Sequence, residues 1–224
     1  MYETLIRENL PRVREAIDAA ARRGGRDGSR VTLVAVTKAH PPEALQAALS
    51  AGIRDLGENR LEELEGKVGL LGRDAATWHM VGHVQSRKAR QAVEAADLIH
   101  SVDTVKLARR ISRFALEMDT RVSVLVQVNV SGEDAKSGFH SSEALEAIHE
   151  IVELPGLDLR GLMTMAPFVD DETVLRRVFG GLRRLQDDAE DLEGYTGREL
   201  SMGMTNDFEL AVEEGSTMVR IGTA

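Results

Sequence analysis

The stretch Val31-Thr-Leu-Val-Ala-Val-Thr-Lys38 decides how the rest of the chain is interpreted. Its apolar residues predict a buried β-strand over residues 31–38, with Lys38 at the carboxyl end of that strand. Two interpretations of this lysine stand side by side. The stem can be buried while the amine reaches solvent at the rim of the protein. Alternatively, the amine can form a Schiff base with a carbonyl compound.

More short apolar runs follow this one, and they alternate with helical patterns. Seven further strands are predicted at residues 53–59, 77–83, 98–103, 121–130, 157–165, 199–204 and 217–221. An extra helix is expected at about residues 2–23, and Pro11 should kink or restart it. Eight strands alternating with helices are typical of an α/β protein built as a (β/α)8 TIM barrel. An open doubly wound sheet is the alternative.

Length and composition narrow the class of protein. The 224 residues, 42% of them hydrophobic, suit a single domain over residues 1–224 with its barrel at about 31–224. The net charge of −9 argues against nonspecific binding of nucleic acid, and the absence of cysteine excludes disulfides and thiol nucleophiles. The charged N-terminal segment, and the lack of a long apolar window, predict a cytoplasmic protein that does not cross a membrane.

The C-terminal part carries a candidate phosphate site. Barrels that bind phosphate do so after strands seven and eight, near the start of a helix. Ser201 and Gly203 close the predicted seventh strand, and Gly222 and Thr223 follow the eighth. Glycine lets backbone N–H groups approach a phosphate, and hydroxyl groups add donors. Ordinary turn chemistry would also account for a Gly-Thr pair. A lysine combined with a phosphate site suggests pyridoxal 5'-phosphate (PLP).

Other polar residues lie close to the predicted strand ends. Arg220 shares a strand face with Gly222, so it could reach the pyridine nitrogen of PLP or pair with a carboxylate in the barrel wall. Asn59 and His83 either line the site or have a local structural role. Met202 is core filler or touches a bound ring.

A metal site is not expected. His79 and His83 have a spacing that would place two metal ligands on one face of a helix. On a strand their side chains lie roughly 13 Å apart, at about 3.3 Å per residue. That separation is too large for the two rings to share one zinc ion.

Six segments together resemble a known family, the PLP homeostasis proteins of the YggS/PROSC type. The fold of that family is similar to the N-terminal barrel of alanine racemase. The segments are Val34-Ala-Val-Thr-Lys38, Gly57-Glu-Asn-Arg60, Trp78-His-Met-Val-Gly-His-Val-Gln85, Gly161-Leu-Met-Thr-Met165, Leu200-Ser-Met-Gly-Met204 and Gly215-Ser-Thr-Met-Val-Arg-Ile-Gly-Thr223.

The resemblance implies a role for several residues. It makes Lys38 the lysine that holds PLP as a Schiff base, and it places Arg220 near the ring nitrogen. It also implies that Ser201, Gly222 and Thr223 contact the phosphate. The family's segment after the eighth strand has no counterpart in the sequence, which leaves the last helix of the barrel an open point.

Two functions remain open, an amino-acid racemase or decarboxylase and a PLP carrier. An arginine beside the ring nitrogen disfavours its protonation and makes the ring a poorer electron sink. The only tyrosines, Tyr2 and Tyr195, lie outside the predicted strand ends, so neither supplies an opposing base. We therefore expect a monomeric PLP-binding protein of intracellular PLP homeostasis, with PLP-dependent apo-enzymes as partners and no robust catalytic activity. A Schiff-base aldolase acting on phosphosugars is the less favoured third reading.

Overall fold

Eight parallel strands close into a barrel in the computed structural model, which describes residues 2–133 and 135–222. Each strand pairs with the next around the ring, and β9 pairs with β1. That closing pair confirms the predicted (β/α)8 barrel, because an open doubly wound sheet would leave two unpaired edges. The strands of the ring are β1 (Thr32–Val36), β2 (Asp55–Glu58), β3 (Thr77–Met80), β4 (Leu98–Val102), β5 (Val122–Asn129), β7 (Leu157–Met163), β8 (Glu199–Met204) and β9 (Met218–Ile221).

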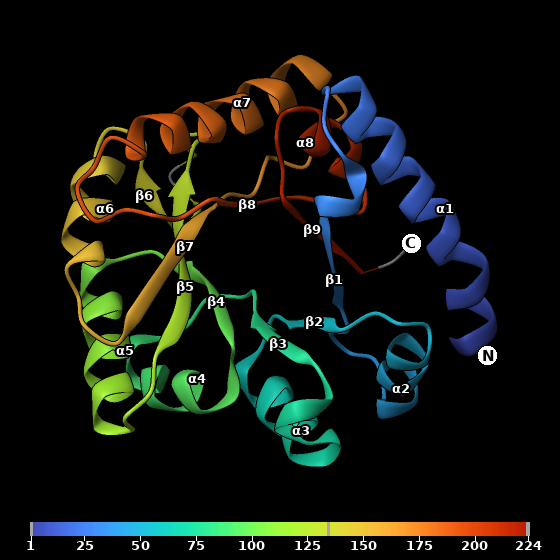
Figure 1. Ribbon diagram of the computed structural model, residues 1–224, viewed down its shortest axis with the longest axis horizontal. Coiled ribbons are helices and arrows are strands. Elements are labelled where there is room, and N and C mark those ends of the chain that lie inside the picture. The colour runs from blue at the N-terminus through green and yellow to red at the C-terminus, as the bar shows by residue number, and fades with distance from the viewer. Residues whose placement is uncertain (1, 134, 223–224) are drawn as a thin grey trace.

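Helices surround the barrel and cover the outer face of its strands (Figure 1). They are α1 (Tyr2–Arg23), α2 (Pro42–Ser50), α3 (Leu61–Leu71), α4 (Ala89–Ala95), α5 (Val105–Glu117), α6 (Ala144–Val152), α7 (Glu172–Ala189) and α8 (Phe208–Glu213). Three short 3-10 helices and the two-residue strand β6 (Phe139–His140), which pairs with β5, complete the described elements. Among the helices of the described residues, none has the length and apolar character needed to span a membrane.

The N-terminal helix α1 takes a place in the ring of helices. It contacts both α8 and α2, and Figure 1 shows it lying along the outside of the barrel beside them. Ile17 and Ala20 anchor it because both side chains are fully buried. The helix runs through Pro11 as one element, so the predicted restart does not occur. Packing against the barrel compensates for the backbone hydrogen bond that proline cannot donate.

Two apolar clusters hold the barrel together. The larger one lies between the strands and the helices, and Leu33 and Leu56 belong to it. The smaller one comprises Val34, Leu98, Leu125, Met163 and Met218. Since successive residues of a strand point to opposite faces, Leu33 faces the helices while Val34 faces the barrel interior.

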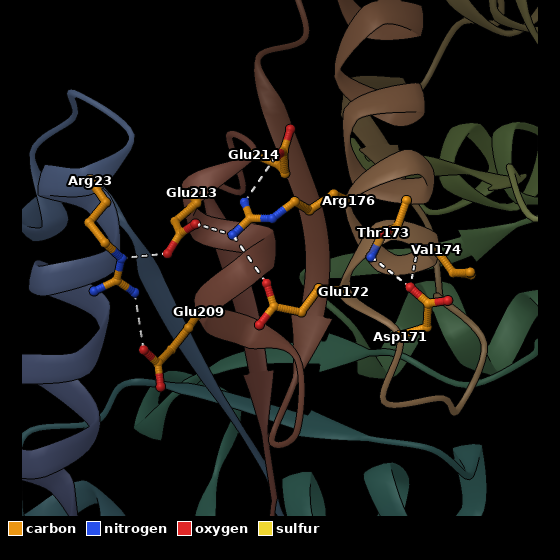
Figure 2. Close-up of polar contacts among 9 residues, drawn as sticks. All are labelled: Arg23, Asp171, Glu172, Thr173, Val174, Arg176, Glu209, Glu213 and Glu214. Atoms are coloured by element: carbon orange, nitrogen blue, oxygen red, sulfur yellow. Dashed lines mark hydrogen bonds and ion pairs between the residues drawn. The ribbon is translucent and has the colours of Figure 1, made fainter.

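Ion pairs join α1 and α7 to α8 (Figure 2). Arg23 of α1 pairs with Glu209 at 3.2 Å and with Glu213 at 2.5 Å. Arg176 of α7 pairs with Glu213 at 2.7 Å and with Glu214 at 3.3 Å. Glu213 accepts from both arginines, which lowers the pKa of its carboxyl group although burial opposes that shift. The network therefore braces the short helix α8 from two sides.

The predicted elements differ from the observed ones mainly at their ends. Strand β8 has the predicted bounds, but β1 ends at Val36 and β3 ends at Met80. Each of these two strands stops before the polar residue that was predicted to close it, because the chain turns away at the rim of the barrel. The N-cap residue of the short helix α8 is Asp207.

Candidate functional site

Five of the residues singled out from the sequence line one cleft at the carboxyl ends of the strands. The cleft has a volume of about 500 Å³, within the range of about 300–1,000 Å³ that is usual for sites of small ligands. Since β1, β2, β3 and β9 all point their carboxyl ends here, their following loops meet at this rim. The five residues are Lys38, Asn59, His83, Arg220 and Gly222.

Lys38 lies on a turn that directly follows Thr37, two residues beyond the end of β1, and its side chain is exposed. The N–H of His40 donates to the Thr37 carbonyl at 3.0 Å and closes the turn. The N–H of Ala39, a residue with φ of 60°, donates to Glu63 Oε2 at 3.0 Å. The backbone on both sides of Lys38 is therefore held, while its amine stays accessible from the cleft.

A buried ion pair supports this turn from below. Lys67 donates to the Thr37 carbonyl at 2.7 Å and to Glu58 Oε1 at 2.5 Å. The Thr37 hydroxyl donates to the same carboxylate oxygen. Burial raises the pKa of Glu58, while its bonds to Lys67 and Thr37 lower it. Both partners of the pair come from the elements that follow β1, so the position of Lys38 depends on tertiary contacts.

His83 and Asn59 form the adjoining wall. His83 has a side chain that is 54% exposed, and its Nδ1 lies 2.9 Å from Asp103 Oδ2. Gly82, just before it, packs against the backbone of Asn59. A Cβ atom at Gly82 would lie 2.0 Å from the Asn59 carbonyl oxygen, so a larger residue would displace this wall.

Arg220 approaches the cleft from inside the barrel and is only 2% exposed. Its Nη1 donates to Ser201 Oγ at 2.5 Å, and its Nη2 donates to the Thr164 carbonyl at 3.0 Å. Burial lowers the pKa of Arg220 to about 10, and the nearby Asp207 counteracts that shift. The guanidinium group therefore remains charged at neutral pH and has a fixed orientation.

The rim between β8 and β9 carries the groups suited to an anion. The N–H of Gly222 donates to the Thr205 hydroxyl at 3.3 Å, and both residues line the cleft. Asp207 Oδ1 accepts from the N–H of Met204 at 2.6 Å, and burial raises the pKa of Asp207. Thr223, predicted to contribute a further hydroxyl, lies outside the described residues.

Three other predicted site residues do not line the cleft. Ser201 is fully buried, and its hydroxyl is bonded to Arg220 and to His100 inside the barrel. Met202 is fully buried in the cluster between the strands and the helices. Gly203 has φ of 93° and packs beneath α8, where an added Cβ would lie 2.6 Å from the Ala211 Cβ. The expectation that the Ser201 hydroxyl faces the cleft is thus not met, because the rim is reached only at Met204 and Thr205.

The cleft also contains residues that the sequence analysis did not select. Lys136, on the loop after β5, pairs with Glu133 at 2.8 Å and donates to the Met165 carbonyl at 3.4 Å. Gln127 lies at the end of the same strand and donates to the Ser137 carbonyl at 2.9 Å. A rule that selected every polar residue within a few positions of a strand end would have found Gln127 and Thr205, but not Lys136, which lies seven positions beyond the end of β5.

Comparison with known proteins shows which class of barrel this chain forms. The family model of the alanine racemase N-terminal domain matches residues 9–224. A solved protein of unknown function from Bifidobacterium adolescentis is 40% identical, with a TM-score of 0.93, and the match covers 99% of this chain and 94% of that one. PipY of Synechococcus elongatus, solved with PLP bound, is 34% identical, with a TM-score of 0.81 and coverage of 91% and 98%.

Curated relatives narrow the class further. The pyridoxal phosphate homeostasis protein of Pseudomonas aeruginosa is 42% identical over 221 residues, which cover 98% of this chain and 94% of that protein. The Escherichia coli K12 protein of the same name is 39% identical over 227 residues, with the same coverage of the two chains. The chain belongs to the pyridoxal phosphate homeostasis protein family.

Proposed function

We propose that the protein binds PLP in this cleft, holds it as a Schiff base on Lys38, and serves PLP homeostasis in the cytoplasm. One observation carries the proposal. An exposed lysine on a rigid turn and a buried, charged arginine face the same cleft of about 500 Å³. PipY, a relative solved with PLP bound, supports the same assignment.

The residues of the cleft fit the three parts of PLP. The Thr205 hydroxyl and the Gly222 N–H would each donate a hydrogen bond to the phosphate. These two bonds would replace the 3.3 Å hydrogen bond from the Gly222 N–H to the Thr205 hydroxyl. Met165 and Met204, both partly exposed in the cleft, offer apolar contact to the ring. Arg220 would lie near the ring nitrogen. Phosphate contacts through Ser201 and Thr223 stay predictions from the sequence.

Lys38 supplies the covalent link. Lys38 would hold PLP through a C=N bond between its amine nitrogen and the aldehyde carbon of PLP, with one water released. The exposed position leaves the amine accessible from the cleft. Arg220 keeps the ring nitrogen unprotonated, because a second positive charge beside the guanidinium is unfavourable. The bound PLP would then be a weak electron sink, which suits a carrier better than an enzyme.

Delivery of PLP to PLP-dependent apo-enzymes is the role that we assign to the open cleft. Lys38 is exposed at the edge of the cleft, so PLP bound to it would remain accessible from the rim of the barrel. We further propose that one barrel over residues 1–224 acts as a monomer. Sedimentation velocity at micromolar protein concentration tests that point, and a dimer would contradict it.

An amino-acid racemase or decarboxylase remains the second candidate, and one observation favours it. The pair of His83 and Asp103 lies at the cleft and resembles a general base with its orienting carboxylate. Neither described tyrosine takes part, because Tyr195 is buried with its hydroxyl on Gln186 and Tyr2 lines a separate groove beside α2. Turnover of common amino acids at about 1–1000 per second would favour the enzyme over the carrier.

Trapping of the Schiff base tests the proposed function. Protein incubated with PLP should turn yellow, lose that absorbance on borohydride reduction, and yield one modified peptide containing Lys38. The Lys38→Ala variant should yield none, whereas Lys106→Ala, which alters a lysine outside the cleft, should behave like the wild type. A principal adduct on Lys136 or Lys88 contradicts the assignment, and absence of any PLP chromophore would favour an aldolase.

Transfer to an apo-enzyme tests the carrier role. The PLP-loaded protein and an apo-enzyme are separated by a dialysis membrane, or mixed directly, and the regained enzyme activity is followed in time. Faster reactivation on direct mixing than across the membrane supports delivery by contact. Equal rates would show that PLP is merely released into solution, which contradicts the carrier role.

A further inference from the structure

A chain of polar side chains runs through the interior of the barrel. The distances are 3.1 Å from Asp55 Oδ1 to His79 Nε2 and 2.9 Å from His79 Nδ1 to His100 Nε2. His100 Nδ1 lies 2.9 Å from Ser201 Oγ, and Ser201 Oγ lies 2.5 Å from Arg220 Nη1. Five different strands supply one residue each. All are nearly or fully buried except Asp55, whose side chain is 29% exposed.

The chemistry of the five groups fixes the direction of every hydrogen bond. An arginine only donates, so Ser201 Oγ accepts from Arg220, and among the described residues His100 Nδ1 is the partner left to accept the Ser201 proton. His100 therefore carries its own proton on Nε2 and donates it to His79 Nδ1. His79 in turn carries its proton on Nε2 and donates it to the Asp55 carboxylate. Both histidines are thus neutral and protonated on Nε2.

The burial of His100 agrees with this assignment. Burial holds the pKa of His100 well below its ordinary value, and the charge of Arg220 acts in the same direction. A doubly protonated His100 would present a donor to Ser201, whose hydroxyl would then have no acceptor for its proton. The geometry and the pKa direction therefore both require a neutral ring in this position.

This chain of hydrogen bonds from Asp55 to Arg220, which we call the relay, joins the two ends of the barrel. Asp55 is the first residue of β2 and lies at the amino ends of the strands, whereas the cleft lies at the carboxyl ends. Arg220 has a nearer carboxylate in Asp207, which acts on its charge. The relay instead acts on orientation, because the Ser201 oxygen and the Thr164 carbonyl hold two nitrogens of the same planar group.

We propose that Asp55, His79, His100 and Ser201 are positioning residues that aim Arg220 at the floor of the PLP cleft. A change at the partly exposed Asp55 then alters how PLP is bound at the far end of the barrel. The inference rests on the proposed function, since it gives Arg220 a bound ring to orient. The relay consists only of this chain's own side chains, so its protonation pattern can be measured without the cofactor.

Nuclear magnetic resonance of 15N-labelled histidine tests the relay in the PLP-free protein at pH 7. We expect His79 and His100 to be neutral, with the proton on Nε2 in both rings. The Ser201→Ala variant should leave His79 unchanged and alter the signals of His100. A His100 ring that is protonated on Nδ1, or a charged His100, would overturn the relay whatever PLP does.

The Asp55→Asn variant tests the effect on the cleft. Asp55 is partly exposed, and asparagine has nearly its shape, so the variant should fold. We expect PLP affinity to fall at least about fivefold, the lower end of coupling between distant sites. We also expect the absorbance band of bound PLP to shift. The matched control is Asp158→Asn, which changes another partly exposed carboxylate near the start of a strand, paired with Arg160 at 3.4 Å.

The outcomes separate the two proposals. An unchanged absorbance band in the Asp55→Asn variant overturns the positioning role, whether or not affinity falls, because a loss of affinity alone would reflect general destabilisation. An equal shift in the Asp158→Asn control would also overturn it. If the wild type binds no PLP, the proposed function fails, while the histidine signals still decide whether the relay exists.

Discussion

Lys38 forms the wall of the cleft that follows β1, Arg220 forms the wall on the neighbouring strand β9, and the two are held in different ways. Lys38 follows β1, is exposed, and is fixed only through the backbone on either side of it. Arg220 lies within β9, is 2% exposed, and is fixed through its own side-chain nitrogens. A nucleophilic amine needs access and a change of charge, whereas a cation that orients a ring needs neither. The two walls therefore separate the reacting group from the orienting group.

Replacement of Lys67, the buried cation beneath Lys38, should have the largest effect on the stability of the protein. In the Lys67→Met variant, Glu58 keeps only its bond from Thr37. We expect the free energy of unfolding to fall by about 3–5 kcal/mol, as when one partner of a buried ion pair is removed. Urea denaturation provides the measurement.

The pH dependence of that loss identifies its cause. Lys67 lowers the pKa of Glu58, so its removal raises that pKa further. A raised pKa gives stability that is present at low pH and lost as the pH rises, so the loss should be smaller at pH 5 than at pH 8. Lys88→Met, which breaks an exposed pair with Glu62, should cause no measurable change. Equal losses in both variants would contradict the distinction between the two pairs.

The Arg220 wall should be most sensitive at Gly203, where β8 meets α8. The Gly203→Ala variant places a Cβ 2.6 Å from Ala211 Cβ at a residue with φ of 93°. We expect a loss of about 2–4 kcal/mol in stability, from overpacking and backbone strain. Gly66→Ala in α3 is the control, because no atom lies within 4 Å and alanine favours a helix. Thermal unfolding of both variants checks the contrast, which fails if the control is equally destabilised.

Removal of a hydroxyl from the rim of the same wall should weaken PLP binding without changing the fold. The Thr205→Val variant deletes the hydroxyl that the structure places beside the Gly222 N–H. We expect a loss of about 1.5–3 kcal/mol in PLP binding, as for hydrogen bonds to charged groups. Titration with PLP, followed by absorbance, gives the value. An unchanged affinity would place the phosphate elsewhere, and Ser201→Ala would then be the variant to compare.

The buried histidine behind Arg220 should make stability depend on pH. Because the pKa of His100 in the folded state lies well below 6.5, acid favours the unfolded state, in which the ring binds its proton more readily. Its contribution is complete above pH 6.5 and is lost as the pH falls, at up to about 1.4 kcal/mol per pH unit. The His100→Gln variant should show a smaller slope between pH 6.5 and pH 5. An unchanged slope would contradict the burial of a neutral ring.

The smallest effect on stability is expected from the ion pairs between Arg176 of α7 and the carboxylates at the end of α8. The Arg176→Gln variant removes ion pairs with Glu213 and Glu214, but the arginine side chain is 38% exposed. Solvent screening should limit the loss in stability to below about 1 kcal/mol. The difference from the wild type should vanish in about 1 M salt, where the screening length is about 3 Å. Arg198→Gln, on another part of the surface, is the control and should cause no larger change.

The sequence supported some predictions of the site better than others. Lys38, Asn59, His83 and Gly222 follow strands, and the rule that a barrel binds ligands at its strand ends selects these four residues, which line one cleft in the structure. Ser201 was placed at the rim but lies in the interior. The register of β8 against β9 shifts between Ser201 and Met204, so that Met204 rather than Gly203 is the strand partner of Arg220. Local patterns do not reveal such a shift.

The sequence by itself determined the order of strands and helices and the lysine at the end of the first strand. These features depend on apolar periodicity and turn residues, which act over a few neighbouring positions. Only the tertiary structure decided that Lys67 lies under Lys38, and that Asp55, His79, His100 and Ser201 connect to Arg220. The physical reason is that closure of the barrel brings together side chains up to 165 positions apart along the chain, and strand stagger sets their height within it.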